Sequence, residues 1–124
     1  MAKILIVDDD YETIKLLEGI VKSKGHEPYS ISESKNAIKA IENVLPDLVL
    51  LDIMMAEING IAICKLIKSD PALSHIPVVM VSALNDEGTK KDAFNAGANE
   101  FITKPIYPGE FMRRINNMLT EQQK

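Results

Sequence analysis

The hydrophobic residues of this chain form two kinds of pattern that alternate along the sequence. Three short apolar runs are rich in branched side chains and lack the polar–apolar alternation of a half-exposed strand, as is typical of buried parallel strands. They occupy residues 4–7, 48–51 and 78–81. Two weaker candidates, residues 28–31 and 100–103, are brief or alternating, as expected near the edges of a sheet. The pattern predicts five strands.

The segments between these runs carry apolar residues at helical spacing, and we expect each set to face inward. The sets are Ile14, Leu17 and Val21; Ala37, Ile38, Ile41 and Val44; Ile63, Leu66 and Ile67 in a helix over about 59–68; Ala93, Phe94 and Ala96 in one over about 86–96; and Phe111, Ile115, Met118 and Leu119.

Helix-boundary signals flank several of these segments. Ser32 or Ser34 precedes the second helix, and Pro108 lies near the start of the fifth. Gly25 and Gly97 are residues suited to a left-handed helix end. These signals support five separate helices.

Strict alternation of strand and helix predicts an α/β fold of the (βα)5 type. Right-handed crossovers then give a doubly wound parallel sheet with helices on both faces. The 124 residues are too few for an eight-stranded barrel and fit one compact domain. We expect this domain to span residues 1–120, with 121–124 as a frayed tail or the start of a linker.

Charge and cysteine content exclude several functions. Lys and Arg total 14 against 18 Asp and Glu, so the basic excess of a nucleic-acid binder is missing and we expect no direct contact with nucleic acid. A single cysteine, Cys64, permits neither an internal disulfide nor a cysteine metal cluster. The four-residue apolar run near the N-terminus is too short for a signal peptide or a membrane span. We therefore expect a cytoplasmic domain that does not bind membranes.

Polar residues follow four of the predicted strands, where an open parallel sheet binds its ligands. They are Asp8, Asp9 and Asp10; Asp52; Ser82; and Lys104 with Pro105. Carboxylates converging on one sheet edge repel one another unless a hard cation such as Mg²⁺ lies among them. A lysine and a hydroxyl nearby suit a phosphoryl group. The constellation therefore has the groups needed for transient aspartyl-phosphate chemistry.

The segments ILIVDDD, DLVLLDIMM, VVMVSA and FITKP resemble the receiver domains of two-component response regulators, and the resemblance extends over essentially the whole chain. It implies a flavodoxin-like fold with strand order 2-1-3-4-5. It also implies that Asp52 is the phosphoacceptor and that Asp8, Asp9, Asp52 and the Met54 backbone carbonyl hold Mg²⁺ or Mn²⁺. Ser82 and Lys104 would bind the phosphoryl group.

The same resemblance implies a switch and a set of partners. Ser82 and Phe101 would move together after phosphorylation, and the peptide between Lys104 and Pro105 would be cis. The phosphoryl donor would be a sensor histidine kinase or a phosphotransfer protein. The face made by the fourth helix, fifth strand and fifth helix would control a partner, a homodimer or an effector domain C-terminal to this chain. Such a phosphorelay domain is a phosphoprotein in signal transduction that catalyses only its own phosphotransfer and slow autodephosphorylation.

Two positions qualify this expectation. Many receivers carry proline four residues after the phosphoacceptor, where this chain has Ala56, so we expect a less rigid loop. The residues two beyond the acceptor and two beyond the hydroxyl flank the water that hydrolyses the phosphate in receivers. Here they are the apolar Met54 and Leu84, which cannot orient that water.

Less specific interpretations stay open for single residues. Asp8 or Asp10 could be helix caps, Ser82 could cap the fourth helix in addition, and Phe101 could be plain core. His26 and His75 have no partner at metal or catalytic spacing in the sequence and are expected to be structural or surface residues, and Cys64 is expected to be a small buried thiol.

Three other functions deserve comparison. A haloacid-dehalogenase-like phosphatase needs Thr or Val where this chain has Glu12, and a flavin protein needs a phosphate loop after Val7 that is missing. A third alternative is a degenerate receiver that serves only as an interaction module, and the intact Asp52 and Lys104 argue against it.

Overall fold

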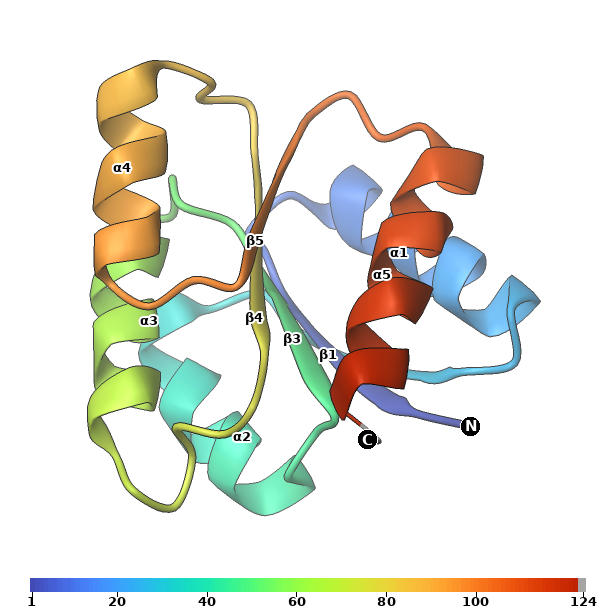
Figure 1. Ribbon diagram of the computed structural model, residues 1–124, viewed down its shortest axis with the longest axis horizontal. Helices are drawn as coiled ribbons and strands as arrows, with labels where there is room; N and C mark the ends of the chain where they lie inside the picture. Colours follow the sequence, from blue (N-terminus) through green and yellow to red (C-terminus); the bar gives the residue numbers. More distant parts are fainter. Residues whose placement is uncertain (123–124) are drawn as a thin grey trace.

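The computed structural model describes residues 1–122 and contains the predicted alternation of strands and helices (Figure 1). In chain order the elements are β1 (Lys3–Val7), α1 (Tyr11–Ser23), β2 (Glu27–Ile31), the short 3₁₀ helix η1 (Ser34–Asn36), α2 (Ala37–Val44), β3 (Leu48–Leu51), α3 (Gly60–Ser69), β4 (Val78–Ser82), α4 (Glu87–Asn95), β5 (Glu100–Thr103) and α5 (Pro108–Gln122). The last helix therefore includes the first two residues of the expected tail, and residues 123–124 lie outside the described part.

The five strands form one parallel sheet in the order β2-β1-β3-β4-β5. Helices α2, α3 and α4 cover one face, and α1 and α5 cover the other (Figure 1). This arrangement confirms the flavodoxin-like, doubly wound fold. Pairing of Val7 with Leu51 and of Ser82 with Thr103 aligns the ends of neighbouring strands, so the residues that follow them meet at one edge.

Alternate residues of each buried strand belong to different cores. Leu5 and Val7 pack in a cluster with residues of α2, α3 and α4, while Ile4 and Ile6 pack in a second cluster with α1 and α5. Both faces of β1, β3 and β4 are thus apolar, which explains why the sequence shows unbroken apolar runs there instead of alternation.

Asp and Asn side chains begin three of the helices. Asp10 accepts from the Glu12 N–H, Asn59 from the Ile61 and Ala62 N–H groups, and Asp86 from the Thr89 N–H. Such caps satisfy amide donors that have no partner within the helix.

At their other ends, α1 and α4 are followed by Gly25 and Gly97, with φ of 81° and 105°. Glycine adopts these angles without the penalty that a Cβ brings. The two glycines therefore mark the ends of α1 and α4, as the sequence predicts.

The structure corrects two inward assignments. Leu66 is 52% exposed and Phe94 is 46% exposed, although we expected both to face the core. Ile63 and Ile67 are one turn apart and occupy the inward stripe of α3, and Leu66 is rotated from Ile67 by about 100°. A helix packed on one side of a sheet buries only that stripe.

The start signal proposed for the second helix is also wrong. Ser32 is exposed, and Ser34 is buried but bonds to a neighbouring loop. The position that begins α2, Asn36, makes no side-chain cap bond. Helix α2 instead continues from the turn of η1.

None of the helices in the described part of the chain combines the length and apolar content needed to cross a bilayer.

Candidate functional site

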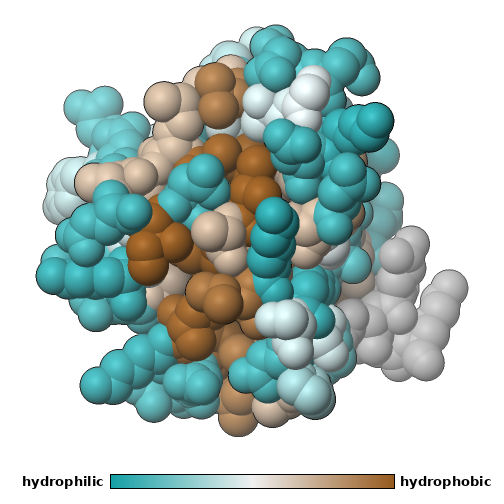
Figure 2. All heavy atoms as spheres, turned by 90° about the vertical axis from the view of Figure 1, so that its left-hand side faces the viewer, coloured by the Kyte–Doolittle hydropathy of each residue, from teal (hydrophilic) through white to brown (hydrophobic). Residues whose placement is uncertain are grey.

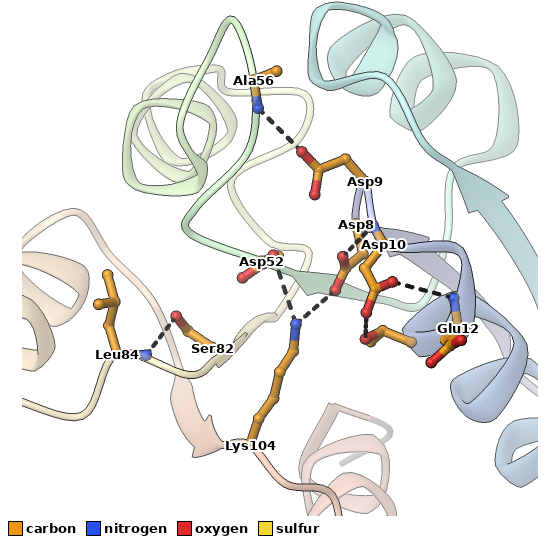
Figure 3. A network of polar contacts seen from close by, with 10 residues as sticks. Asp8, Asp9, Asp10, Glu12, Asp52, Ala56, Ser82, Leu84 and Lys104 are labelled. Atoms are coloured by element: carbon orange, nitrogen blue, oxygen red, sulfur yellow. Dashed lines mark hydrogen bonds and ion pairs between the residues drawn. The ribbon is translucent and has the colours of Figure 1, made fainter.

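Four strand ends bring the predicted site residues to the same edge of the sheet (Figure 3). Asp8 follows β1, Asp52 follows β3, Ser82 ends β4 and Lys104 follows β5. These residues are far apart in sequence, and their proximity results from the parallel strand order.

Three carboxylates form a compact acidic cluster. Asp8, Asp9 and Asp52 each offer an oxygen atom, and these atoms all lie within 4.8 Å of one another. Asp8 and Asp52 are 2% and 6% exposed, while Asp9 is exposed. An all-oxygen donor set that is partly open to solvent fits Mg²⁺, which prefers carboxylates and keeps several waters.

Lys104 supplies the positive charge of the site. Its Nζ atom lies 3.1 Å from Asp8 Oδ2 and 3.6 Å from Asp52 Oδ2 (Figure 3). The main-chain N–H of Lys104 donates to the Ser82 carbonyl, and the Lys104–Pro105 peptide is cis. The ammonium group therefore reaches the two buried carboxylates from the far side of β4.

The pKa of Asp52 is raised from its ordinary 3.8 to about 6, first by burial of the carboxyl group and second by the negative charge of Asp8. The Lys104 charge and the N–H groups of Ile53 and Met54 oppose this shift. A buried carboxylate beside another is costly to ionise, and a cation at the cluster would reduce that cost.

The third aspartate of the run has a different role. Asp10 caps α1 and accepts a 2.7 Å hydrogen bond from the Thr13 hydroxyl. Asp8 does not cap the helix; it accepts from the Asp10 N–H at 2.9 Å. The capping interpretation is thus confirmed for Asp10 and wrong for Asp8.

Ser82 is 1% exposed, and its Oγ accepts from the Leu84 N–H at 3.2 Å (Figure 3). Helix α4 begins later and is capped by Asp86, so the suggestion that Ser82 caps this helix is wrong. Ser82 is the last residue of β4, so its hydroxyl lies at the same sheet edge as the other site residues.

Phe101 is 6% exposed and lies in the core shared with α2, α3 and α4. Lys90 Nζ lies 5.8 Å from the centre of its ring, and the Arg114 guanidinium donates to its carbonyl at 2.9 Å. Arg114 also pairs with Glu100 at 2.6 Å. These contacts connect α4, β5 and α5.

The loop between β3 and α3 is held by contacts that the sequence did not indicate. The Ala56 N–H donates to Asp9 Oδ2 at 3.2 Å, and Ser34 Oγ bonds to Ala56 and Ile58. At Gly60 a Cβ would lie 2.0 Å from the Asp52 carbonyl oxygen. We expected a less rigid loop because Ala56 replaces proline, but that expectation did not include these hydrogen bonds. A proline at position 56 has no N–H and could not donate the bond to Asp9.

Sequence signals for Ser34 and Gly60 are weak. Serine before a helix usually indicates a cap, and the pairing partner of Ser34 lies 22 residues away. The Asn59-Gly60 pair indicates only a turn or helix start. Neither contact can be recognised from the residues next to Ser34 or Gly60 in the sequence.

Comparison with known proteins gives a consistent result. The family model for the response regulator receiver domain matches residues 4–116. The chain is 34% identical over 117 residues to the response regulator PleD of Caulobacter vibrioides, covering 94% of this chain and 26% of PleD. It is 33% identical over 117 residues to the DNA-binding response regulator MtrA of Mycobacterium tuberculosis, covering 94% of this chain and 50% of MtrA.

Among solved structures, a response regulator from Chloroflexus aurantiacus superposes with a TM-score of 0.91 at 32% identity, covering 96% of this chain and 98% of the other. The chain thus spans about a quarter to a half of the length of the two curated relatives, and nearly all of this solved chain.

Proposed function

Because the chain belongs to the response regulator receiver domain family of two-component signalling, we propose that it accepts a phosphoryl group on Asp52. Receivers are signalling domains and not classical enzymes, and they act with histidine kinases. The observation that carries the proposal is the position of Lys104 Nζ between the carboxylates of Asp8 and Asp52. This geometry supplies a nucleophile and a cation for a phosphoryl group at one point.

The first requirement of the reaction is an ionised nucleophile. The pKa of Asp52 is raised to about 6, mainly by burial, so most of this carboxyl group is ionised at neutral pH. An Asp52 oxygen then attacks the phosphorus of a phosphohistidine, the new oxygen–phosphorus bond forms as the nitrogen–phosphorus bond breaks, and the electron pair stays on the histidine nitrogen.

Asp8, Asp9, Asp52 and the Met54 carbonyl are the groups we propose to hold Mg²⁺ or Mn²⁺. The close spacing of the three carboxylates supports this assignment. The bound cation would neutralise charge on the phosphoryl oxygens. Lys104 is placed to pair with a phosphoryl oxygen on Asp52, and Ser82, at the end of β4, to donate its hydroxyl.

Signal output is proposed to involve the face formed by α4, β5 and α5. Phe101 already lies inward, so phosphorylation would stabilise this ring position and not create it. Lys90 over the ring and Arg114 on the carbonyl of Phe101 would then be held with it. This face would bind a partner, a second copy or an effector domain. We also propose that the domain acts in the cytoplasm.

The direct test is phosphorylation by acetyl phosphate with Mg²⁺, followed by intact mass measurement. The wild type should gain one phosphoryl group, and Asp52→Asn should gain none because asparagine keeps the shape but lacks the nucleophile. Circular dichroism would verify that the variant is folded. A wild type that stays unlabelled would favour a degenerate receiver, and label on the variant would place the acceptor elsewhere.

A further inference from the structure

The loop from Ile53 to Asn59 contains a strained turn. Glu57 has φ of 73°, and the Ile58 N–H donates to the Ala56 carbonyl at 3.0 Å, two residues back. A positive φ inside such a three-residue γ-turn is unfavourable for a residue with a side chain. Something outside the turn must therefore help to hold it.

Ser34 contacts both ends of this turn. Its hydroxyl donates to the Ala56 carbonyl at 2.6 Å and accepts from the Ile58 N–H at 3.0 Å. The side chain is 4% exposed, so water competes little for these bonds. The hydroxyl uses its donor and one acceptor position on the two groups that define the turn.

The same turn also contacts the acidic cluster. The Ala56 N–H donates to Asp9 Oδ2 at 3.2 Å (Figure 3), and Asp9 is one of the three clustered carboxylates. Ala56 therefore bonds to Ser34 through its carbonyl and to Asp9 through its N–H. The Gly60 N–H donates to the Ile53 carbonyl at 2.9 Å, and this hydrogen bond joins the two ends of the loop.

We infer that Ser34 is a positioning residue for the metal site: it holds the Ala56–Ile58 turn, and through the Ala56 N–H it orients the Asp9 carboxylate. The inference rests on the proposed function, because it concerns the cation that the acidic cluster would bind. Groups that hydrogen-bond to metal ligands commonly change metal affinity by a factor of roughly 10 to 100. Ser34 acts one bond further out, so the lower end of that range is expected.

The test is a titration of the whole chain with Mg²⁺ alone, followed by NMR amide shifts. Ser34→Ala should weaken Mg²⁺ binding about tenfold. Ser34→Thr keeps the hydroxyl and should bind Mg²⁺ better than Ser34→Ala. Ser30→Ala is the matched control, because Ser30 Oγ makes a 2.7 Å bond to Glu18 on β2 and α1, away from the loop.

Hydrogen exchange supplies a second readout. The Ile58 amide should exchange faster in Ser34→Ala and keep its protection in Ser30→Ala. A loss of global stability would speed exchange at protected amides throughout the protein, whereas loss of the Ser34 bond should speed exchange at the Ile58 amide selectively.

A double-mutant cycle tests the role of strain. Glycine adopts a positive φ freely, so in a Glu57→Gly background the removal of the Ser34 hydroxyl should cost less Mg²⁺ affinity than in the wild-type background. The cycle also cancels the charge lost with Glu57. If Ser34→Ala folds poorly in the wild-type background, comparing Glu57→Gly with and without Ser34→Ala still measures how removal of the hydroxyl changes Mg²⁺ affinity.

Failure of the inference differs from failure of the proposed function. A wild type that does not bind Mg²⁺ would contradict the assignment of the metal site. A wild type that binds Mg²⁺, with Ser34→Ala equal to it in both affinity and Ile58 exchange, would overturn the role of Ser34 alone.

Discussion

Asp52 combines burial with a charge that its proposed function requires. Because the folded state raises the pKa of this carboxyl group to about 6 from 3.8, the folded protein binds the Asp52 proton more tightly than the unfolded chain does. The stabilising contribution of the neutral form is complete below about pH 4 and is lost as the pH rises through about 6. At neutral pH the ionised group opposes folding.

We therefore predict that Asp52→Asn raises the free energy of unfolding at pH 8, without added cation, by about 1 to 3 kcal/mol. The difference between variant and wild type should shrink toward zero near pH 4. Urea denaturation at both pH values measures it. A variant that is equally or less stable than the wild type at pH 8 would contradict the charge-burial argument.

Two apolar side chains border the site. Met54 is 62% exposed, and Met54 and Leu84 line the same surface hollow as Asp9 and Ala56. Neither side chain can hydrogen-bond to a water that approaches an aspartyl phosphate, and both can obstruct it. This arrangement is consistent with the expected slow dephosphorylation.

The combined variant Met54→Asn with Leu84→Glu should lose its phosphoryl group faster than the wild type, by a factor on the order of ten, because polar groups can orient the water. Decay of the phosphorylated mass after removal of acetyl phosphate measures the rate. Exposed Leu45→Asn, on the distant end of α2, is a control for changes in surface polarity. An unchanged decay rate would show that these side chains do not govern hydrolysis.

At the scale of elements, the junction between β3 and α3 depends on one glycine. A Cβ at Gly60 would lie 2.0 Å from the Asp52 carbonyl oxygen and 2.9 Å from the Ile53 Cα. All the nearest atoms are backbone, so no side chain can rotate away. The start of α3 therefore packs directly against the strand end that carries Asp52.

Gly60→Ala should destabilise the protein by about 1 to 3 kcal/mol and slow phosphorylation, because relief of the clash displaces the Asp52 backbone. Gly19→Ala is the matched control, since Gly19 is in α1 with nothing within 4 Å of its Cβ position. That change should stabilise by about 0.5 to 1 kcal/mol and leave labelling unchanged. Equal effects of the two substitutions on urea denaturation would disprove the close-contact argument.

The elements were predictable because their signals are local. The buried strands show as apolar runs and the polar residues follow them directly in sequence, so Asp8, Asp52 and Lys104 could be placed at one edge once the alternation of strands and helices predicted a parallel sheet. Leu66 and Ser34 could not be placed correctly. The exposure of Leu66 depends on which stripe of α3 packs against the sheet, and the bonds of Ser34 depend on a loop 22 residues later.

At the scale of the whole molecule, the helices divide the surface into distinct faces. Figure 2 shows apolar side chains gathered on the face that α3 and α4 border, and Leu66 and Phe94 are the exposed large hydrophobic residues of those helices. The proposed output face is formed by α4 together with β5 and α5, where Lys90 and Arg114 contact Phe101.

Phosphorylation should change amide exchange on that output face. We expect altered protection in α4, β5 and the first turns of α5, and little change in β2 and α2, which lie at the other end of the sheet. Mass-spectrometric hydrogen exchange on labelled and unlabelled protein measures this, with Asp52→Asn treated identically as the control. Equal protection of α4, β5 and α5 in the labelled and unlabelled protein would argue against the proposed face.

The direction of α5 has a consequence for anything joined to this chain. Strand β1 starts, and α5 ends, at the opposite end of the strands from the carboxylates (Figure 1). Helix α5 has 15 residues and so spans about 22 Å between these two ends. A fluorescent protein or an affinity tag fused before β1 or after α5 would thus be attached on the far side and would leave the acidic cluster accessible to a phosphoryl donor.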